Sequence, residues 1–384
     1  MMKTSKIEVK NQDLLAALED FLESILALDG IDALLAPQLL PMKNIVMPIL
    51  ITNPDQLEKV DPLAPSFPMN SAKLVSKLTR KSSGSKIAVV LRSCEIRAFI
   101  ELNKLKQGRI DDVVIIGIDC LGAFDGKTYK KYVEENGPES TQLYYKSVLL
   151  NQKNAVDEFI LSPACQICEK PIADGADISI GLYGMNFESE MLLQAKTEKG
   201  IKVFNKLGLA EMEAPSSRKE AVDKLIAERT GKLAAALNKT AEASNSVEKL
   251  TQYLASCVNC YNCRVACPVC YCKECVMLTD VFDHEPVQYL QWADQRGILK
   301  MPTDTVFYHI TRMTHMSLAC VGCGQCSNAC PNDIPLVELF RAAADRTQKS
   351  FGYEAGKNID EPPPLSIFHE DEYKEVVGIT SRSE

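Results

Sequence analysis

Two similar cysteine runs constrain this 384-residue chain more than any other feature of its sequence. Each run has the spacing Cys-x2-Cys-x2-Cys-x3-Cys-Pro, once from Cys257 to Cys267 and once from Cys320 to Cys330. A cubane iron–sulfur cluster needs four thiolates. With this spacing, three come from one tight loop and the fourth comes from the other run. The proline after each fourth cysteine turns the chain away from the cluster.

The predicted ligand sets therefore cross between the two runs. We expect one 4Fe-4S cluster on Cys257, Cys260, Cys263 and Cys330, and a second on Cys320, Cys323, Cys326 and Cys267. Zinc is the alternative metal. However, tetrahedral zinc sites usually pair two Cys-x2-Cys knuckles without a third regular cysteine and a following Cys-Pro. The spacing thus favours two clusters in a ferredoxin-like domain.

Eleven of the fifteen cysteines fall between positions 257 and 330. Three of these, Cys270, Cys272 and Cys275, follow the first run at once. They are either ligands of a further zinc or iron–sulfur site or spare thiols packed around a cluster. No fourth ligand is evident in the sequence, so we leave these three cysteines unassigned.

Four more cysteines lie in the first half of the chain. Cys94 and Cys120 each follow a predicted strand, and the carboxyl edge of a parallel sheet is where cofactors collect in α/β folds. Cys165 and Cys168 form a Cys-x2-Cys pair further on. Four thiols are enough for a third cubane, but free cysteines are also common as small core residues. Spacing alone leaves both interpretations open.

The residue pattern predicts an α/β N-terminal domain followed by a helix-expanded dicluster ferredoxin domain. Residues 86–91 and 113–118 are β-branched runs typical of buried parallel strands, and the predicted helix at 95–107 makes them a βαβ unit. Residues 14–28 predict a helix, and 176–182 and 192–197 predict strands. The two segments between the cysteine runs predict two more helices. The expected divisions are 1–205 for the α/β domain, 206–250 for a helical linker, 251–345 for the ferredoxin domain and 346–384 for a C-terminal tail, which we expect to be exposed from Glu361 onward.

Charge and hydropathy exclude several function classes. The formal net charge of -8, without a long basic run, argues against general binding to nucleic acid or anionic lipid. The first residues lack the apolar segment of a signal peptide, and the strongest apolar run, 113–118, is too short to span a bilayer. We therefore expect a cytoplasmic protein, in which clustered cysteines indicate metal rather than disulfides.

A few other side chains are candidates for supporting roles. His309 and His315 lie on a predicted helix before the second run, where a histidine either donates to a cluster sulfide or serves as an ordinary packing or surface residue. No Ser/His/Asp set, carboxylate pair or nucleophile motif stands out, so no catalytic side chain is assigned.

Several segments resemble one family in a fixed order. They are VVLRSCEIRAFIELNKLKQ, VVIIGIDCLG, SPACQICEKPIADGADISIG, CVNCYNCRVACPVCYCKEC, MPTDTVFYHITRMTHMSLACVGCGQCSNACPNDIPL and FHEDEY. From about residue 21 onward, the chain is similar to the beta subunit of deazaflavin-linked formate dehydrogenases and hydrogenases. The resemblance links an α/β module to a ferredoxin module, which makes it specific.

This resemblance implies an iron–sulfur flavoprotein that serves as one subunit of an oxidoreductase. Such a protein carries FAD, exchanges hydride with the deazaflavin coenzyme F-420, and passes electrons to a catalytic alpha subunit or to another partner, such as a heterodisulfide-reductase-like complex. The resemblance also implies a third 4Fe-4S cluster, on Cys94, Cys120, Cys165 and Cys168. Lys170 and Arg92 lie beside these cysteines in the sequence, where they either contact a flavin pyrophosphate, offset cluster charge or are simply solvated side chains.

The chain departs from the family pattern at the expected flavin end. It has Leu91-Arg92-Ser93-Cys94 where the family has Gly-Thr-Pro-Cys, and the family's N-terminal Gly-Gly segment is not seen among its residues. It also lacks a phosphate-binding Gly-x-Gly-x-x-Gly. The sequence therefore predicts an electron-transfer subunit, with a flavin-free polyferredoxin that only connects redox partners as the alternative.

Overall fold

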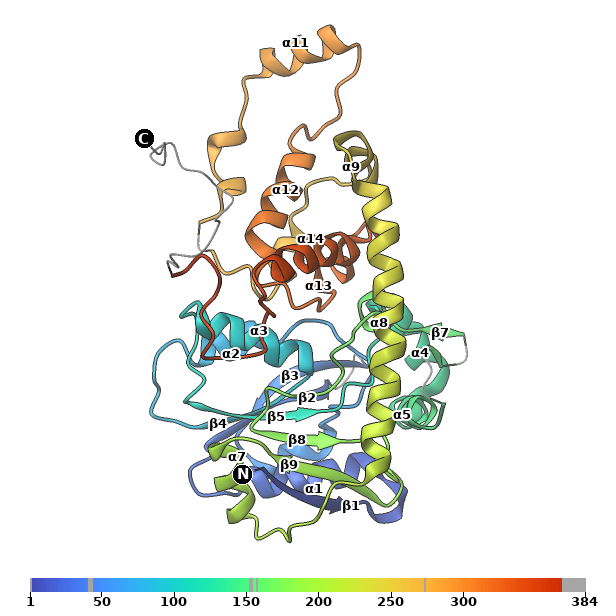
Figure 1. Ribbon diagram of the computed structural model, residues 1–384, viewed down its shortest axis with the longest axis vertical. Helices are drawn as coiled ribbons and strands as arrows, with labels where there is room; N and C mark the ends of the chain where they lie inside the picture. Colours follow the sequence, from blue (N-terminus) through green and yellow to red (C-terminus); the bar gives the residue numbers. More distant parts are fainter. Residues whose placement is uncertain (1, 41–43, 152–154, 157, 273, 368–384) are drawn as a thin grey trace, which may run out of the picture.

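The computed structural model describes residues 2–40, 44–151, 155–156, 158–272 and 274–367. Its first half contains a seven-stranded sheet with the order β1-β9-β8-β5-β4-β2-β3 (Figure 1). The strands are β1 (Lys3–Glu8), β2 (Ala33–Leu40), β3 (Ile45–Ile51), β4 (Ile87–Leu91), β5 (Val113–Ile118), β8 (Ile178–Gly181) and β9 (Glu190–Ala195). A separate hairpin pairs β6 (Ala155–Val156) with β7 (Phe159–Ile160).

The centre of the sheet is parallel and its edges are antiparallel. Strands β2, β4, β5 and β8 run parallel, whereas β3 joins one side and β9 and β1 join the other in antiparallel register. Strands β4 and β5 are entirely buried, as their β-branched composition predicts. The predicted βαβ unit is confirmed, because α3 (Ser93–Lys104) connects these two parallel strands.

Helices cover both faces of this sheet (Figure 1). One face packs against α1 (Leu14–Leu26), through alternate residues such as Ala88 and Val90 of β4. The other face packs against α2 (Ala72–Leu78) and α3, through Ile87 and Val89. The first-half helices also include α4 (Gly126–Asn136), α5 (Ser140–Asn151), α6 (Pro163–Gln166) and α7 (Glu198–Lys206).

The bounds of strand β9 differ from the predicted ones, and a helix cap explains where the strand ends. The sequence places a strand at 192–197, but β9 spans Glu190–Ala195. The chain leaves the strand because the side chain of Thr197 accepts a hydrogen bond from the Gly200 amide and caps α7.

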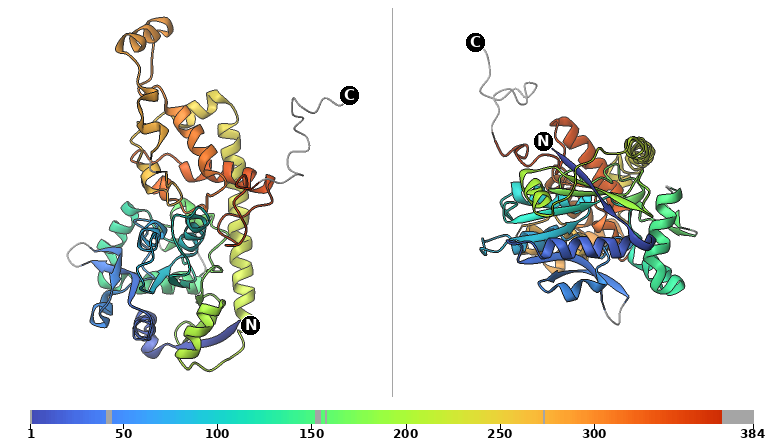
Figure 2. Two further views of the ribbon diagram at one scale, coloured as in Figure 1. Left: turned by 90° about the vertical axis from the view of Figure 1, so that its left-hand side faces the viewer. Right: turned by 90° about the horizontal axis from the view of Figure 1, so that it is seen from below.

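The cysteine-rich second half is built mainly from helices. The 29-residue α8 (Ser216–Ser244) runs from the sheet to this part, where the remaining helices follow (Figure 1, Figure 2). They are α9 (Val247–Tyr253), α10 (Asn262–Ala266), α11 (Pro286–Arg296), α12 (Thr305–Met316), α13 (Gln325–Asn328) and α14 (Leu336–Ser350). Short 3-10 helices lie at Lys10–Gln12, Pro54–Lys59, Gly137–Glu139, Val276–Leu278 and Asp280–Phe282.

The two helices predicted between the cysteine runs are α11 and α12, and they differ in environment. Helix α11 buries no residue and projects away from the rest of the molecule (Figure 2). Helix α12 packs inside the cysteine-rich part and buries Tyr308, His309, Arg312 and Met316. Only α12 can therefore contribute side chains to an internal site.

The two halves share one hydrophobic core. Val269, Met316 and Val321 of the cysteine-rich part pack with the β4, β5 and α3 residues on one face of the sheet. Among the described helices, none has the length and apolar character that crossing a membrane would require.

Part of the segment assigned to the C-terminal tail, residues 346–356, is folded onto the rest of the molecule. Helix α14 continues to Ser350, and the following residues return to α3, where Tyr353 and Ala355 are buried. The Arg97 side chain donates to the carbonyl of Ala355 at 2.9 Å, and the Gly356 amide donates to Glu101 at 2.7 Å. The sequence does not predict this contact with α3, because the segment is polar and the bonds that hold it are made mostly by main-chain groups. Residues 368–384 of the predicted tail, including FHEDEY, lie outside the described residues.

Candidate metal centres

The first cavity is lined by one predicted ligand set: Cys257, Cys260, Cys263 and Cys330. Cys263 lies on α10, and Cys330 follows α13. Between the first three thiols, Asn259 and Tyr261 have φ values of 49° and 60°, so the loop turns tightly around the cavity. We call this the first-run cavity.

The second cavity is lined by the other predicted set: Cys267, Cys320, Cys323 and Cys326. Gly322 and Gly324 have positive φ values of 72° and 77°, which glycine adopts without steric cost. The remaining wall is apolar, except for Arg312 of α12. In this second-run cavity, as in the first, one thiol comes from the other cysteine run.

The third cavity lies at the carboxyl edge of the sheet, and we call it the sheet-edge cavity. It is lined by the four cysteines of the first half: Cys94, Cys120, Cys165 and Cys168. Cys94 begins α3, Cys120 follows β5, and the other two lie in and after α6. The structure thus brings together four thiols from three separate segments.

Main-chain bonds hold these three segments in place. The Cys120 amide donates to the carbonyl of Pro171 at 2.8 Å, and the Ser162 amide donates to that of Ala123 at 2.8 Å. The Glu95 carboxylate accepts from the amides of Arg92 and Ser71, at 2.9 and 2.7 Å, and fixes the first turn of α3. The protein fold therefore positions the sheet-edge thiols.

The sheet-edge and second-run cavities are direct neighbours. Gly322 and Cys323 line both of them. The loops around the two cavities also touch, since a Cβ atom placed on Gly324 would overlap the Cβ of Ala164. The Gln325 side chain donates to the carbonyl of Phe67 at 3.0 Å and ties the second run to the first half.

The donor chemistry fits iron–sulfur clusters. All fifteen cysteines are free thiols. Burial raises the pKa of Cys94 and Cys168, and raises that of Cys267 to about 11. Thiolates in these cavities therefore need positive charge, which cluster iron supplies. Within the described residues, no three His, Cys, Asp or Glu side chains are grouped to hold a single ion. A cubane has a different requirement, because each thiolate binds a different iron.

The three unassigned cysteines do not gather into one set. Cys270 packs against the same hydrophobic cluster as Cys267 and Cys323 of the second-run cavity, whereas Cys275 packs against the same cluster as Cys257 of the first-run cavity. Cys272 is exposed. This arrangement matches the interpretation of Cys270 and Cys275 as thiols packed near the candidate clusters.

The two histidines on α12 lie in different environments. His309 is fully buried, and its Nε2 lies 3.4 Å from the Sγ of Cys257. Burial lowers the pKa of His309 to about 4, so its imidazole is neutral at pH 7. His315 is exposed. Only His309 is therefore placed to interact with a ligand.

Buried arginines are the residues that sequence reasoning missed. Arg229 of α8 and Arg312 of α12 line the sheet-edge and second-run cavities respectively. Arg229 donates to the carbonyl of Cys168 at 3.5 Å, and Arg312 donates to that of Cys263 at 3.1 Å. Each also has nitrogen atoms without a partner in the described structure. No sequence motif marks a single arginine on a helix, so only the fold reveals them.

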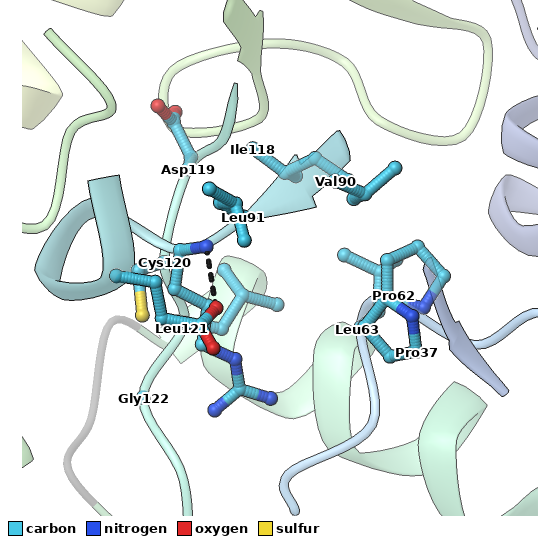
Figure 3. Close-up of a pocket in the computed structure, with 12 residues that line it drawn as sticks. Pro37, Pro62, Leu63, Val90, Leu91, Ile118, Asp119, Cys120, Leu121 and Gly122 are labelled. Atoms are coloured by element: carbon cyan, nitrogen blue, oxygen red, sulfur yellow. Dashed lines mark hydrogen bonds between the residues drawn. The ribbon is translucent and has the colours of Figure 1, made fainter. Parts of the chain in front are cut away.

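A further small cavity adjoins Cys120 at the ends of β4 and β5 (Figure 3). Its wall is largely apolar, and the carboxylate of Asp119 and the sulfur of Cys120 point away from Pro37 and Leu63 across it (Figure 3). Arg92 is its one cationic side chain: its Nη2 donates to the carbonyls of Ala64 and Ser66, which leaves Nη1 as the one buried nitrogen without a partner in the described structure. These residues do not fit a flavin pyrophosphate, which needs several free donors.

Arg92 and Lys170, the two cations that sequence reasoning placed near a flavin or a cluster, both line the sheet-edge cavity. Lys170 also forms an ion pair with Glu354 at 2.5 Å. Both side chains are therefore close to the candidate ligands, and their role stays a prediction.

Comparison with known proteins gives matches in both halves of the chain. Residues 84–218 match the family described as the C terminus of the coenzyme F420 hydrogenase/dehydrogenase beta subunit, and residues 315–335 match a 4Fe-4S binding domain. The chain is 29% identical over 343 residues to the F420-dependent formate dehydrogenase subunit beta of Methanocaldococcus jannaschii, covering 84% of this chain and 86% of that protein. It is 28% identical over 306 residues to the F420-dependent formate dehydrogenase 1 subunit beta of Methanococcus maripaludis, covering 73% and 76%.

Among solved structures, the xenon-derivatised F420-reducing [NiFe] hydrogenase complex from Methanosarcina barkeri matches with a TM-score of 0.46 and 14% identity. That match covers 64% of this chain and 94% of the other.

Proposed function

The chain is a member of the coenzyme F420 hydrogenase/dehydrogenase beta-subunit family, and from that premise we propose that it is the electron-relay subunit of an oxidoreductase complex. The relay would consist of three 4Fe-4S clusters, one in each four-cysteine cavity. A bound cluster supplies single-electron transfer, while the protein supplies its position and its reduction potential.

One observation carries this proposal: Cys323 lines both the sheet-edge cavity and the second-run cavity. The second-run cavity in turn adjoins the first-run loop, since Arg312 in its wall donates to the carbonyl of Cys263. The three candidate sites therefore form a row, with the second-run site in the middle. A row of this kind suits the transfer of electrons between two ends of the protein.

The two ends differ in their access to partners. Cys260 of the first-run set is exposed, and so is its neighbour Val258. Cys94 and Cys120 of the sheet-edge set are only partly accessible. We assign the first-run end to contact with a redox protein.

The relatives are named as formate dehydrogenase beta subunits, which favours a catalytic alpha subunit of a formate dehydrogenase or hydrogenase as one partner. A heterodisulfide-reductase-like subunit is the proposed partner at the other end of the relay. Both assignments rest on the resemblance of this chain to its family.

A flavin-free relay is the second candidate, and the cavity beside Cys120 favours it. Its apolar wall and its single cation, Arg92, do not provide the donors that FAD would need. Acid extraction of the anaerobically purified chain decides between the two. One flavin per chain would support a flavoprotein that reacts with coenzyme F-420, and none would support the flavin-free relay.

The relay itself is tested by interrupting its middle. In the complex with its catalytic partner, we expect substrate to reduce every cluster of the wild-type chain in freeze-quench EPR. In Cys323→Ala, with loss of the middle cluster verified by iron analysis, the terminal cluster far from the catalytic partner should remain oxidised. The control is Cys272→Ala, at an exposed thiol outside the three cavities. Wild-type reduction of both terminal clusters in Cys323→Ala would refute the relay.

A further inference from the structure

Arg312 is a buried cation at the junction of two candidate clusters. It lies on α12, is 5% exposed, and lines the second-run cavity together with its four thiols. Its Nη2 donates to the carbonyl of Cys263, in the loop of the first-run cavity, at 3.1 Å. Its side chain therefore touches one site and faces the other.

The hydrogen-bonding capacity of Arg312 is mostly unused. Its Nε and Nη1 have no hydrogen-bond partner in the described part of the chain. The ring of Phe340 lies 4.5 Å from its guanidinium carbon and that of Tyr308 lies 5.8 Å away. Such cation–π contacts contribute roughly 0.5 to 2 kcal/mol, less than the several kcal/mol that desolvating a charge costs. A buried guanidinium with two free nitrogen atoms therefore indicates a missing anion.

Apart from Arg312 itself, the ionisable side chains that line the second-run cavity are its four cysteines. Among the described ion pairs, none includes Arg312. The contrast is Arg341, which also lies near the second run but is neutralised by Glu169 at 2.7 Å. The charge of Arg312 is thus available to a group in the cavity.

The lining of the first-run cavity differs, because no arginine or lysine is among its described residues. It contains thiols, apolar side chains, Asn259, Asn332, Tyr261, Tyr308 and His309. The two ferredoxin-like sites therefore have similar thiol sets, but only the second-run cavity has an arginine in its lining.

We propose that Arg312 donates N–H···S hydrogen bonds to the second-run cluster and raises the reduction potential of that cluster. Adding one electron increases the negative charge of a cluster without breaking a bond, and a facing cation and N–H···S bonds both favour that charge. The middle site of the row therefore accepts an electron more readily than it would without Arg312. This assignment of Arg312 as a positioning residue rests on the proposed relay.

The test is an EPR-monitored redox titration of the full-length, cluster-loaded chain. Arg312→Gln should lower the equilibrium constant for one-electron reduction of the second-run cluster at least tenfold. This corresponds to a fall of about 59 mV in the midpoint potential of that cluster. The first-run midpoint should move less. Cys320→Ala, which removes a second-run ligand, identifies the second-run signal. Arg296→Gln makes the same charge change at an exposed position on α11 and should shift neither midpoint.

Arg312→Lys keeps the positive charge but loses the planar arrangement of donors. The midpoint potential of the second-run cluster should therefore fall by less in Arg312→Lys than in Arg312→Gln. If Arg312→Gln does not retain its clusters, Arg312→Lys decides: a lowered second-run midpoint supports the inference, and an unchanged one overturns it. Full iron content with an unchanged midpoint in Arg312→Gln would also overturn it, while leaving the relay intact. Failure of the relay itself would instead appear as missing iron in the wild-type chain.

Discussion

The two ferredoxin-like cavities and the sheet-edge cavity reach the same four-thiol arrangement in different ways. In the ferredoxin-like part, three thiols of each set come from one short loop, held by residues with positive φ. At the sheet edge, the thiols come from the ends of β5, α3 and α6, which the buried sheet aligns. The difference teaches that packed strands and helices position the sheet-edge thiols, whereas the conformation of one short loop positions most thiols of each other set.

The largest effect expected from this comparison concerns the buried ion pair behind Cys120. Two nitrogens of Arg218 contact the carboxylate of Asp119 at 2.6 and 3.0 Å, and Asp119 also accepts from the Leu182 amide at 2.8 Å. Asp119→Asn should lower the free energy of unfolding by about 3 to 5 kcal/mol, because it leaves Arg218 buried without its anion. Urea unfolding measures the change.

The matched control for that pair is Glu158→Gln, which removes an exposed ion pair with Lys131 at 2.7 Å. It should leave the free energy of unfolding nearly unchanged, because solvent screens an exposed pair. If Asp119→Asn lowered the free energy of unfolding as little as Glu158→Gln, the ion pair of Asp119 with Arg218 would not anchor the sheet edge.

The second effect concerns the contact between the two kinds of loop. Gly324 has a φ of 77°, and an added Cβ would overlap the Cβ of Ala164. Gly324→Ala should cost about 2 to 4 kcal/mol, since it adds a steric clash to left-handed strain. Gly352 has a φ of 60° and open space around an added Cβ. Gly352→Ala should therefore lower the free energy of unfolding only through the left-handed strain, by about 1 kcal/mol. Equal losses in the two variants, measured by thermal unfolding, would contradict close contact of the loops.

The smallest effect concerns the C-terminal segment on α3, the helix that begins at the sheet-edge cavity. The Tyr353 hydroxyl donates to Glu101 at 2.6 Å and accepts from Lys104 at 2.9 Å. Tyr353→Phe should cost about 1 to 2 kcal/mol, because Glu101 loses a buried donor. Tyr271→Phe, at an exposed ring, is the control and should be nearly neutral. If both variants unfold alike, the segment contributes little to the order of α3.

The same comparison explains how much the sequence could predict. The short strands β4 and β5 and the helix between them were predictable from apolar runs, and the first-run and second-run thiols could be grouped from spacing alone. Cys94, Cys120 and Cys165 could not be grouped that way, because they are far apart in the chain and only the sheet brings them together.

Arg229 and Arg312 carry no sequence signal, since their role depends on which helix face is buried. The packing of residues 351–356 on α3 was likewise hidden, because main-chain groups make most of its bonds. Contacts between distant segments are the part of this molecule that pattern reasoning cannot reach.

Iron and sulfide analysis of the anaerobically purified chain, with and without Cys120→Ala, tests the central claim most directly. Three cubanes predict about twelve irons per chain, falling to about eight in the variant while both ferredoxin EPR signals remain. A wild-type content of about eight irons that Cys120→Ala leaves unchanged would contradict the third cluster, and with it the three-site relay.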